Sequence, residues 1–436
     1  MTAATTNGAA PLPGRVDTLT DKENEGLKKT WLRLIEVFQQ KGVEWVPPVK
    51  VEEVKEVKKS RWGFGGKKES TENKDLFLGA TANPEWLSLP LEKALPLIPG
   101  EALGITFWNM VAGDNPDAVV LRFLRARKWD LDAGFNMLMN CLRWRIVMRV
   151  DDITALGETG IRNELETLKP GMGESFIKNL HSNKSVLGGP DKEGRGISYI
   201  NVRFHKKEDQ DFEVIKLMTL YVMETSRMIV HQPVESSCIV FNLEGFTLAN
   251  MDFEFVKFLL NCFEAYYPET LGSCLIHKAP WVFSTVWTMI TPLLDPVVAS
   301  KIHFTKNLDE LAGFVDMNVL PPFLTGTEEI KVNNDKFPCP PAGTLDRKKT
   351  PEYQDYEDMI REYLHETHAW AKTDLPAKDT KRKQQALHYR HASIKAANYL
   401  RARTSYHDEG LADLENGRLL LKFCGRVPTI DITDCV

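Results

Sequence analysis

The run of residues from 236 to 326 constrains the fold of this chain more than any other part of it. Three short segments in the run are mostly apolar: residues 238–243, 273–278 and 301–304. Strands that are apolar on both faces are typical of a parallel sheet that is covered on both sides. The helical segments between them carry more large apolar side chains than a sheet needs as cover. The run therefore predicts a domain that encloses a hydrophobic ligand and shields it from water.

The residues before this run continue the same alternation. A strand is expected at 196–204, after the turn DKEGRG, and a helix at 213–231, where apolar residues recur at helical spacing. Further helices are expected at 253–266, which Pro268 ends, and at 281–290. Strands that alternate with helices predict an α/β fold with right-handed βαβ units and a largely parallel sheet.

A helical unit precedes the α/β region, and its helix starts can be recognised. Asp114 or Asn115 can cap a first helix that has Pro116 in its first turn. Asp130 can cap a second helix over 131–147. The apolar stripes of these helices need a larger partner to be buried, so we expect the helices to dock on the rest of the protein.

Composition divides the whole chain into five segments. We expect a disordered tail at 1–26, an N-terminal helix with a charged linker or insertion at 27–112, a helical subdomain at 113–172, the α/β domain at 173–327, and a polar, partly basic helical extension at 328–436. In the extension, residues 378–403 hold eight Lys or Arg and one Asp. A run of like charge usually forms a solvated face, which we favour here over a contact with acidic lipid.

Composition also excludes some classes of function. The 436 residues are 43% hydrophobic and carry a formal net charge of −5, so the whole chain gives no indication of nucleic-acid binding. The seven cysteines are widely spaced, which favours reduced thiols over a disulfide framework. The N-terminus lacks the pattern of a secretory signal, and the longest apolar stretch, 280–294, is too short and interrupted to span a bilayer. We therefore expect a cytoplasmic protein that is soluble or peripherally associated with membranes.

Enzyme signatures are missing from the sequence. There is no GxSxG nucleophile elbow and no GxGxxG after a strand, and GPDKEGRG lacks the Lys and Ser or Thr of a P-loop. The histidine pairs His365 and His368, and His388 and His391, lie among polar residues and are expected to be solvated. No nucleophile, base and orienting group can be assembled, so we predict neither an enzyme nor a cofactor or metal site.

Three motifs in order resemble one family. VLRFLRARKWDLDAGFNMLMNCLRWR, EAYYPETLG and LLDPVVASKI, with the closing PPFLTG, together resemble the CRAL-TRIO family, and most closely the fungal phosphatidylinositol-transfer proteins. The resemblance covers residues 113–327. It implies that a helical subdomain packs on an α/β lipid domain, whose largely parallel sheet floors a hydrophobic cavity for a single lipid.

The resemblance also implies a gate helix over the mouth of that cavity, at 281–290. This helix would meet lipid when closed and membrane when open, through five large apolar side chains: Trp281, Phe283, Trp287, Met289 and Ile290. A helix that merely covers the core remains the alternative. Gly272 and Pro292 bracket the region and are candidate hinges.

Four polar positions are implied for the lipid headgroup. By resemblance, Arg127 and Lys301 contact the phosphate and Glu269 reaches the inositol, while Ser237 keeps a headgroup hydroxyl. Cations suit a phosphodiester and a carboxylate suits sugar hydroxyls, but a purely structural pairing of Lys128 or Lys301 with Glu269 is the alternative.

Two departures from the family pattern weaken the case for phosphatidylinositol. Val298 and Ile239 stand where the family has threonines, so two headgroup hydroxyls are lost. Phosphatidylcholine or a neutral lipid such as a sterol or squalene therefore stays open as the ligand. The predicted function is transfer of single phospholipids between membranes by a monomer, and the alternative is a lipid sensor that presents its ligand to a lipid kinase or another protein partner.

Overall fold

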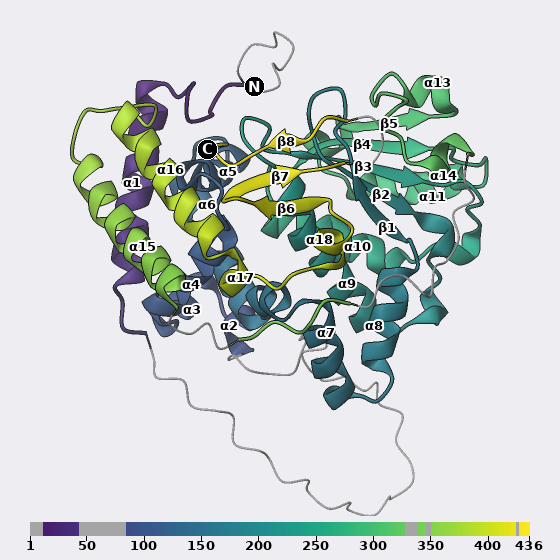
Figure 1. The fold of residues 1–436 in the computed structure, drawn as a ribbon, viewed down its shortest axis with the longest axis horizontal. Helices are drawn as coiled ribbons and strands as arrows, with labels where there is room; N and C mark the ends of the chain where they lie inside the picture. The colour runs from purple at the N-terminus through teal and green to yellow at the C-terminus, as the bar shows by residue number, and fades with distance from the viewer. Residues whose placement is uncertain (1–11, 43–83, 328–338, 346–349, 424–426) are drawn as a thin grey trace, which may run out of the picture.

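The computed structural model describes residues 12–42, 84–327, 339–345, 350–423 and 427–436. Most of the expected charged linker, and residues 1–11 of the expected tail, lie outside these ranges. The described chain forms an α/β body around a five-stranded sheet, with a group of helices beside it (Figure 1).

The central sheet has the strand order β1-β2-β3-β4-β5. Its strands are β1 Ser185–Gly188, β2 Ile197–Asn201, β3 Ser237–Asn242, β4 Leu271–His277 and β5 Ile302–Thr305. Every pair is parallel except β1 with β2, so the prediction of a largely parallel sheet is confirmed. The sequence did not predict β1. The prediction that both faces of the strand at 301–304 are buried was wrong. This strand, β5, lies at the edge of the sheet, and His303 and Phe304 are exposed.

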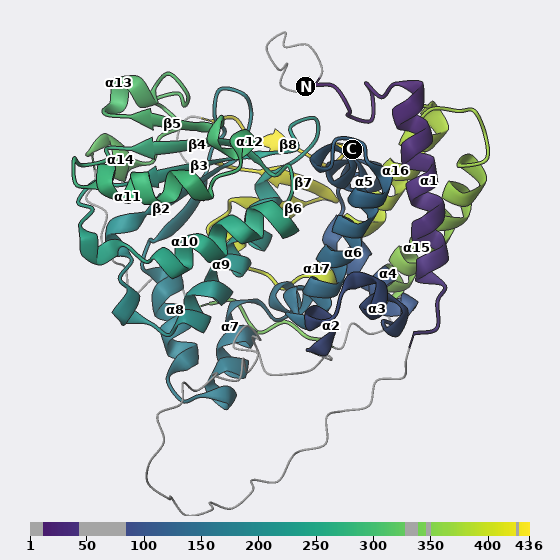
Figure 2. The ribbon, with the colours of Figure 1, turned by 180° about the vertical axis from the view of Figure 1, so that it is seen from behind.

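Helices cover both faces of this sheet. The elements of the α/β region are α8 Met172–His181, α9 Phe212–Ser226, α10 Phe253–Asn261, α11 Phe283–Ile290, α12 Pro296–Ala299, α13 Leu308–Leu311 and α14 Pro322–Thr325. Side chains alternate across β3, so Cys238 and Val240 pack with Leu311 and Leu324 of α13 and α14. Ile239 lies on the opposite face, where it packs with Phe283 of α11. Figure 2 shows α9, α10 and α11 in front of that second face.

The N-terminal helices contribute to two cores: the first six pack together and with the C-terminal extension, whereas the seventh packs with α8 and α9. These N-terminal helices are α1 Asp21–Phe38, α2 Glu85–Ser88, α3 Leu91–Ala94, α4 Gly100–Val111, α5 Pro116–Ala126, α6 Leu131–Val147 and α7 Val150–Leu168. The predicted caps are confirmed, since the side chains of Asn115 and Asp130 accept backbone hydrogen bonds at the starts of α5 and α6. The predicted boundary at residue 113 is not a boundary of packing, because α4 shares one core with α1, α5 and α6.

The disordered tail expected at 1–26 is wrong for residues 12–26. Thr20 and Glu23 form a capping box that starts α1 at Asp21, six residues before the expected start. Before this helix, Arg15 forms an ion pair with Glu235, and Arg125 donates a 2.9 Å hydrogen bond to the Gly14 carbonyl. Residues 12–20 are therefore held in place by contacts with residues that lie far away in the sequence.

The C-terminal extension contains more than the predicted helices. It has α15 Pro351–Trp370, α16 Thr380–Lys395, α17 Ala397–Leu400 and α18 Ser405–Asp408, and then an antiparallel sheet of β6 Ala412–Glu415, β7 Arg418–Leu421 and β8 Ile430–Asp431. Figure 2 shows α15 and α16 against α1. Tyr363 and Tyr389 are buried in the same core as Trp31 of α1. The extension therefore completes the core of the N-terminal helices.

The basic run at 378–403 is not simply a solvated face. Arg382 is buried, and its guanidinium donates hydrogen bonds of 2.6 and 2.8 Å to the two carboxylate oxygens of Asp117. Arg390 is also buried and donates to the carbonyls of Gly113 and Thr433, each at 2.8 Å. The expectation failed because the partners that allow these charges to be buried are distant in sequence.

Candidate functional site

A cavity of about 540 Å³ is lined by the sheet and the helices α9, α10 and α11, and also by residues of the N-terminal helices and the C-terminal extension, such as Trp108 and Ile394. Its floor is the sheet face that carries Ile239 and Phe241 of β3 together with Cys274 and Ile276 of β4. The walls are large apolar side chains from all three helices: Met218 and Val222 of α9, Phe255 and Leu259 of α10, and Phe283, Trp287 and Ile290 of α11. A mostly apolar enclosure of this kind is suited to a hydrophobic ligand.

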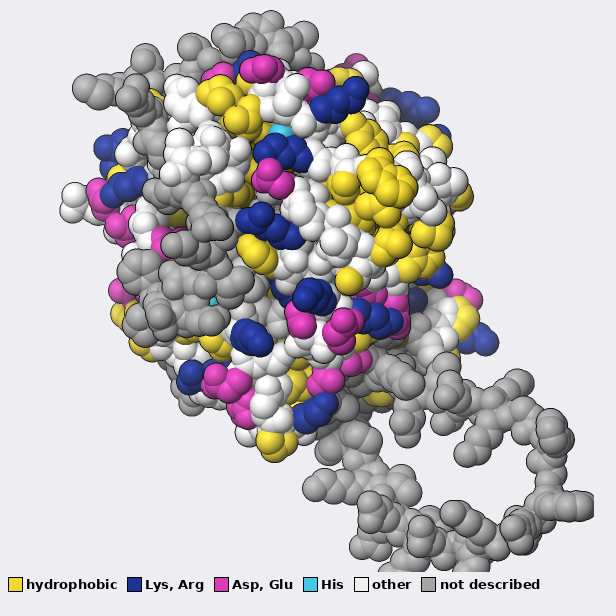
Figure 3. Space-filling view, turned by 90° about the vertical axis from the view of Figure 1, so that its right-hand side faces the viewer, with side chains coloured by type: hydrophobic (Ala, Val, Ile, Leu, Met, Phe, Trp, Pro, Cys, Tyr) yellow, Lys and Arg dark blue, Asp and Glu magenta, His cyan; other side chains and the backbone are white. Residues whose placement is uncertain are grey.

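The helix α11, which corresponds to the expected gate, is apolar on two sides. Phe283, Trp287 and Ile290 line the cavity, whereas Trp281 before the helix is 88% exposed and Met289 is 48% exposed. Figure 3 shows apolar side chains gathered on the surface of this part of the molecule. Leu293, Val297 and Phe304 are exposed hydrophobic side chains that follow soon after in the chain. A helix that only covered a core would not need an apolar outer surface.

One rim of the cavity carries a group of charges that we call the Glu235 cluster: Glu235, Arg15, Arg122 and Arg125. All three guanidiniums approach the same oxygen, Oε2 of Glu235, with Arg125 Nη2 at 2.9 Å and Arg122 Nε at 4.0 Å. Glu235 and Arg122 line the cavity. The buried Nε atoms of Arg122 and Arg125 have no hydrogen-bond partner in the described parts of the chain. The carboxylate oxygens that pair with them lie beyond hydrogen-bond distance, Glu235 Oε2 at 4.0 Å from Arg122 and Glu269 Oε2 at 3.6 Å from Arg125. The hydrogen-bonding capacity of these two donors is therefore not fully used.

Burial, helped by the neighbouring charges of Arg15 and Arg122, lowers the pKa of Arg125 to about 10, although Glu235 and Glu269 oppose the shift. The charged guanidinium is thus less stable in this site than in water. An additional anion beside it would stabilise the charged form.

Three of the four predicted headgroup residues lie together near this rim. Ser237 lines the cavity, and its hydroxyl donates to the Thr270 carbonyl at 3.3 Å. Oε2 of Glu269 lies 3.6 Å from Nε of Arg125. Nζ of Lys301 donates a 2.6 Å hydrogen bond to the carbonyl of Leu271, which lines the cavity.

Lys301 and Glu269 both show signs of a constrained environment. Burial lowers the pKa of Lys301, although the carboxylate of Glu269 opposes the shift. Glu269 has a backbone φ of 62°, in the left-handed region, which non-glycine residues rarely adopt outside turns and binding sites. These two side chains flank the cavity, whereas Ser237 lines it.

Arg127 is not brought to this group. Its side chain lines a separate hollow with Arg143 and Tyr266, and Arg125 instead occupies the place beside Glu269. The resemblance singled out one arginine of RFLRAR and passed over Arg122 and Arg125. Their spacing of three residues places both on one face of α5, which is a pattern that could have identified them.

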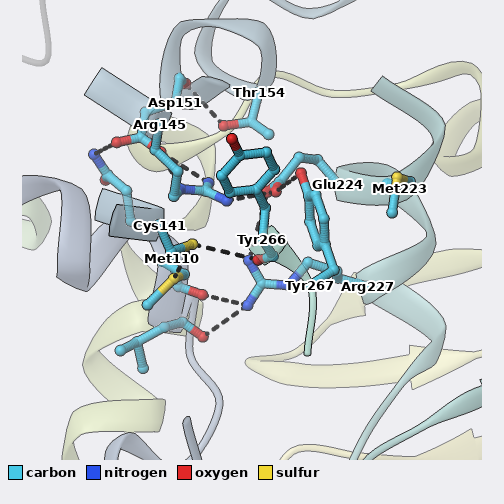
Figure 4. Close-up of polar contacts among 12 residues, drawn as sticks. Met110, Cys141, Arg145, Asp151, Thr154, Met223, Glu224, Arg227, Tyr266 and Tyr267 are labelled. Atoms are coloured by element: carbon cyan, nitrogen blue, oxygen red, sulfur yellow. Dashed lines mark hydrogen bonds and ion pairs between the residues drawn. The ribbon is translucent and has the colours of Figure 1, made fainter. Parts of the chain in front are cut away.

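A second group of arginines, the Glu224 cluster, lies on the α9 side of the protein and consists of Glu224, Arg145, Arg227, Arg401 and Tyr267. Figure 4 shows Glu224 with Arg145, Arg227 and Tyr267. Oε1 of Glu224 accepts from Arg145 at 2.7 Å and from the Tyr267 hydroxyl at 2.8 Å. Oε2 accepts from Arg401 at 3.0 Å and from Arg227 at 3.5 Å. Both oxygens are saturated, and the cluster joins α6, the α/β domain and the C-terminal extension.

Burial alone would raise the pKa of the Glu224 carboxyl, but Arg145, Arg227 and Arg401 outweigh burial and hold this pKa well below its usual value. The glutamate is thus ionised at neutral pH. Arg145, Arg227, Arg401 and Tyr267 line the cavity, but Glu224 does not. We regard the cluster as a structural junction because both oxygens of Glu224 already accept hydrogen bonds within it.

The two positions that depart from the family pattern both face the cavity. Ile239 of β3 and Val298 of α12 are among the side chains that line it. Their methyl groups replace hydroxyls on the wall, which makes that wall more apolar than the family pattern implies.

Comparisons with known proteins decide the family. The family model for the CRAL/TRIO domain matches residues 180–326, and that for the CRAL/TRIO N-terminal domain matches residues 67–140. Phosphatidylinositol transfer protein CSR1 of Eremothecium gossypii is 33% identical over 393 residues, which cover 82% of this chain and 88% of that protein. The chain belongs to the CRAL-TRIO family.

Other relatives carry the same domain name. A CRAL-TRIO domain-containing protein of Schizosaccharomyces pombe is 34% identical over 331 residues, covering 74% of this chain and 71% of that protein. The solved structure titled "Crystal structure of Sfh5" is 14% identical, with a TM-score of 0.43, and the match covers 78% of this chain and 98% of that one. The CRAL-TRIO N-terminal match starts well before residue 113, where the resemblance was expected to begin.

None of the helices within the described ranges combines the length and the apolar character needed to cross a bilayer.

Proposed function

We propose that this protein binds a single lipid in the cavity between the sheet and α9, α10 and α11, and carries it between membranes. The observation that carries the proposal is the helix α11, which presents apolar side chains both to the cavity and to the surface. Such a helix can exchange its contacts with the enclosed ligand for contacts with a bilayer. The name of the Eremothecium relative, phosphatidylinositol transfer protein CSR1, supports this choice.

The protein acts, in this proposal, as a carrier and not as an enzyme. It would be cytoplasmic and monomeric, would touch membranes only transiently, and would need no cofactor besides the bound lipid. Extracting a lipid from a bilayer replaces one apolar environment with another, so the cavity needs volume and apolar walls more than specific contacts. Selectivity then depends on the few polar groups at the rim.

Phosphatidylinositol is the first candidate ligand. Its phosphate would accept from the Nε donors of Arg122 and Arg125, which form no hydrogen bond in the described chain, and would attract Lys301. Glu269 would then accept from inositol hydroxyls in place of its ion pair with Arg125. In this assignment Arg125 takes the phosphate-binding role that the resemblance gave to Arg127. Ser237 offers one further hydroxyl on the cavity wall.

A neutral hydrophobic ligand, such as a sterol or squalene, is the second candidate. It is favoured by Ile239 and Val298, which line the cavity where the family pattern has hydroxyls. The carboxylates of Glu235 and Glu269 also neutralise part of the positive charge that an anionic headgroup requires. Identification of the lipid that copurifies with the full chain, by native mass spectrometry and lipid extraction, separates the two candidates.

The first test of the headgroup site is Lys301→Ala. We expect transfer of phosphatidylinositol between vesicles to fall at least about tenfold, because a cation near the phosphate is lost, while transfer of phosphatidylcholine changes little. Lys306→Ala is the matched control, since Lys306 is an exposed lysine five residues later. An equal loss for both lipids would show that Lys301 is structural, through its hydrogen bond to Leu271.

The test of the gate is Trp281→Ala. This side chain is almost fully exposed, so we expect the variant to keep its bound lipid and its stability but to bind vesicles more weakly and transfer lipid several-fold more slowly. Leu375→Ala, which removes an exposed apolar side chain in the turn between α15 and α16, is the control. Unchanged transfer by the Trp281 variant would contradict membrane contact through this helix.

A lipid sensor that presents its ligand to a kinase or another protein remains the alternative class. A sensor would copurify with lipid but would move none between vesicles in the assay above. Deletion of the C-terminal extension is a poor way to separate these functions, because Tyr363 and Tyr389 complete the core around Trp31.

A further inference from the structure

Three side chains far apart in the sequence meet at one point behind the cavity wall: Glu158 of α7, His181 at the end of α8, and Cys339 in the segment that follows the lipid domain. One donor atom from each lies within 4.8 Å of the donor atoms of the other two. The Cys339 Sγ atom is 3.6 Å from the Nε2 atom of His181. Glu158 and His181 are buried, and Cys339 is partly exposed.

The backbone fixes these positions. Within α7, Gly157 has a φ of 63° and interrupts the helix immediately before Glu158. The segment with Cys339 is tied across the same helix, because the Thr159 hydroxyl donates to the Pro340 carbonyl at 2.6 Å. Gly343 then donates its backbone N–H to α7 at a point where only glycine has room, since a Cβ atom there would lie 1.9 Å from a backbone oxygen.

The two oxygens of the Glu158 carboxylate are held differently. Oε1 accepts from the Tyr221 hydroxyl at 2.6 Å and from the backbone N–H and hydroxyl of Ser405, each at 2.8 Å. Oε2 accepts no well-aligned hydrogen bond among the described residues, although Glu158 is only 1% exposed, and the Cys339 thiol interacts with this carboxylate. A cation in place of the thiol proton would bind the sulfur and this buried oxygen together.

We propose that Glu158, His181 and Cys339 bind a divalent transition metal ion, with Zn²⁺ as the best candidate. A sulfur, an imidazole nitrogen and a carboxylate oxygen form a mixed donor set that suits zinc, whereas Mg²⁺ and Ca²⁺ prefer oxygen ligands alone. In a tetrahedral zinc site, Zn–N of about 2.0–2.1 Å and Zn–S of about 2.3 Å place the two ligand atoms about 3.5–3.6 Å apart. The 3.6 Å between Sγ of Cys339 and Nε2 of His181 agrees with that edge.

The site has a defined place in the protein. Three protein ligands leave a fourth position on zinc for water or another ligand. The hydrogen bonds from Tyr221 and Ser405 to Oε1 would orient the carboxylate in the way that outer partners orient metal ligands. Tyr221 also lines the lipid cavity, and Ser405 belongs to α18 of the C-terminal extension. The ion would therefore fasten the chain after the lipid domain, and the extension, to the wall of the cavity.

The experiment uses the full chain without a polyhistidine tag, stripped of metal by a chelator and titrated with Zn²⁺ against a chromophoric competitor. We expect one Zn²⁺ per chain, and no competition by a large excess of Mg²⁺ or Ca²⁺. Replacement by Co²⁺ is expected to give the near-ultraviolet absorption of a thiolate bound to cobalt and the visible bands of a tetrahedral ion.

The variants Cys339→Ser and His181→Gln are each expected to weaken Zn²⁺ binding at least about 100-fold. The matched controls are Cys435→Ser and His391→Gln, which replace a partly exposed cysteine and a partly exposed histidine elsewhere in the described chain. Both controls are expected to bind Zn²⁺ as tightly as the unchanged protein does. Circular dichroism and thermal unfolding without metal check that each variant folds.

Two results would overturn the proposal. One is stoichiometric Zn²⁺ binding that persists in folded Cys339→Ser, and the other is a cobalt spectrum without thiolate absorption. If Cys339→Ser does not fold without metal, Cys339→Ala is used in its place. Zn²⁺ binding by Cys339→Ala is then compared with that by Cys435→Ala, and equal affinity would overturn the proposal. None of these readouts depends on lipid, so they stand or fall separately from the proposed transfer function.

Discussion

The Glu224 cluster and the Glu235 cluster each surround one buried glutamate with three arginines, but they use the carboxylate differently. Glu224 is 0% exposed and accepts hydrogen bonds through both oxygens. Glu235 is 5% exposed, and all three of its arginines approach a single oxygen. The two clusters therefore contain similar residues, but both carboxylate oxygens are paired with arginines in the Glu224 cluster and only one is in the Glu235 cluster.

That difference separates a structural network from a binding network. A saturated network has no donor left for a ligand, and removing a member leaves buried charges unpaired. In the Glu235 cluster, the Nε atoms of Arg122 and Arg125 form ion pairs at 4.0 and 3.6 Å but no hydrogen bonds, and Arg122 lines the cavity. Buried donors without hydrogen bonds are costly, and a ligand that pairs with them, as in the proposed function, would remove that cost.

The largest effect is expected from Glu224→Gln. The change removes the negative charge that three arginines share, and we expect a loss of about 3–5 kcal/mol in the free energy of unfolding at pH 7. For Glu235→Gln we expect a smaller loss of about 1–2 kcal/mol, because fewer hydrogen bonds depend on that carboxylate. Chemical denaturation of the two variants measures both values. Equal losses would remove the distinction between the clusters.

The dependence of stability on pH should also reveal the contribution of Glu224. The pKa of Glu224 is held below its usual value of 4.5 in the folded protein, so its ionised form stabilises the fold fully above pH 4.5. As the pH falls below 4.5, the unfolded chain takes up the proton first and this stabilisation is lost. At about 1.4 kcal/mol per pH unit, the stability gap between the unchanged protein and Glu224→Gln should narrow by about 2 kcal/mol from pH 4.5 to pH 3. A gap that stays constant with pH would contradict the assignment.

Local patterns in the sequence predicted the parts of the fold that local physics determines. The alternation of apolar segments gave the parallel strands from β2 to β5, and Asn115 and Asp130 cap helices where they were expected to. Each of these features depends on residues within a few positions of one another. The sequence did not separate the two sides of α11, where Phe283, Trp287 and Ile290 line the cavity and Met289 is exposed.

Features that depend on distant partners were missed. The segment before α1 is held in place by the ion pair of Arg15 with Glu235, and Arg382 can be buried because it pairs with Asp117. In each pair the two residues are more than 200 positions apart in the sequence. The same holds for the proposed metal site, where Glu158, His181 and Cys339 form no recognisable spacing and meet only in the folded chain. A single sequence holds no local pattern that reports such pairings.

The smallest effect, and the sharpest test of the comparison, concerns lipid selectivity in Glu235→Gln. Without the carboxylate, Arg122 and Arg125 should attract an anionic headgroup more strongly, so we expect the ratio of phosphatidylinositol to phosphatidylcholine binding to rise about tenfold, or about 1.4 kcal/mol. Glu244→Gln is the control, because Glu244 pairs with Lys278 and does not line the cavity. Exchange of each lipid from vesicles at two salt concentrations measures the ratio. An unchanged ratio would mean that the Glu235 cluster, like the Glu224 cluster, serves the fold alone, and would leave a neutral hydrophobe as the favoured ligand.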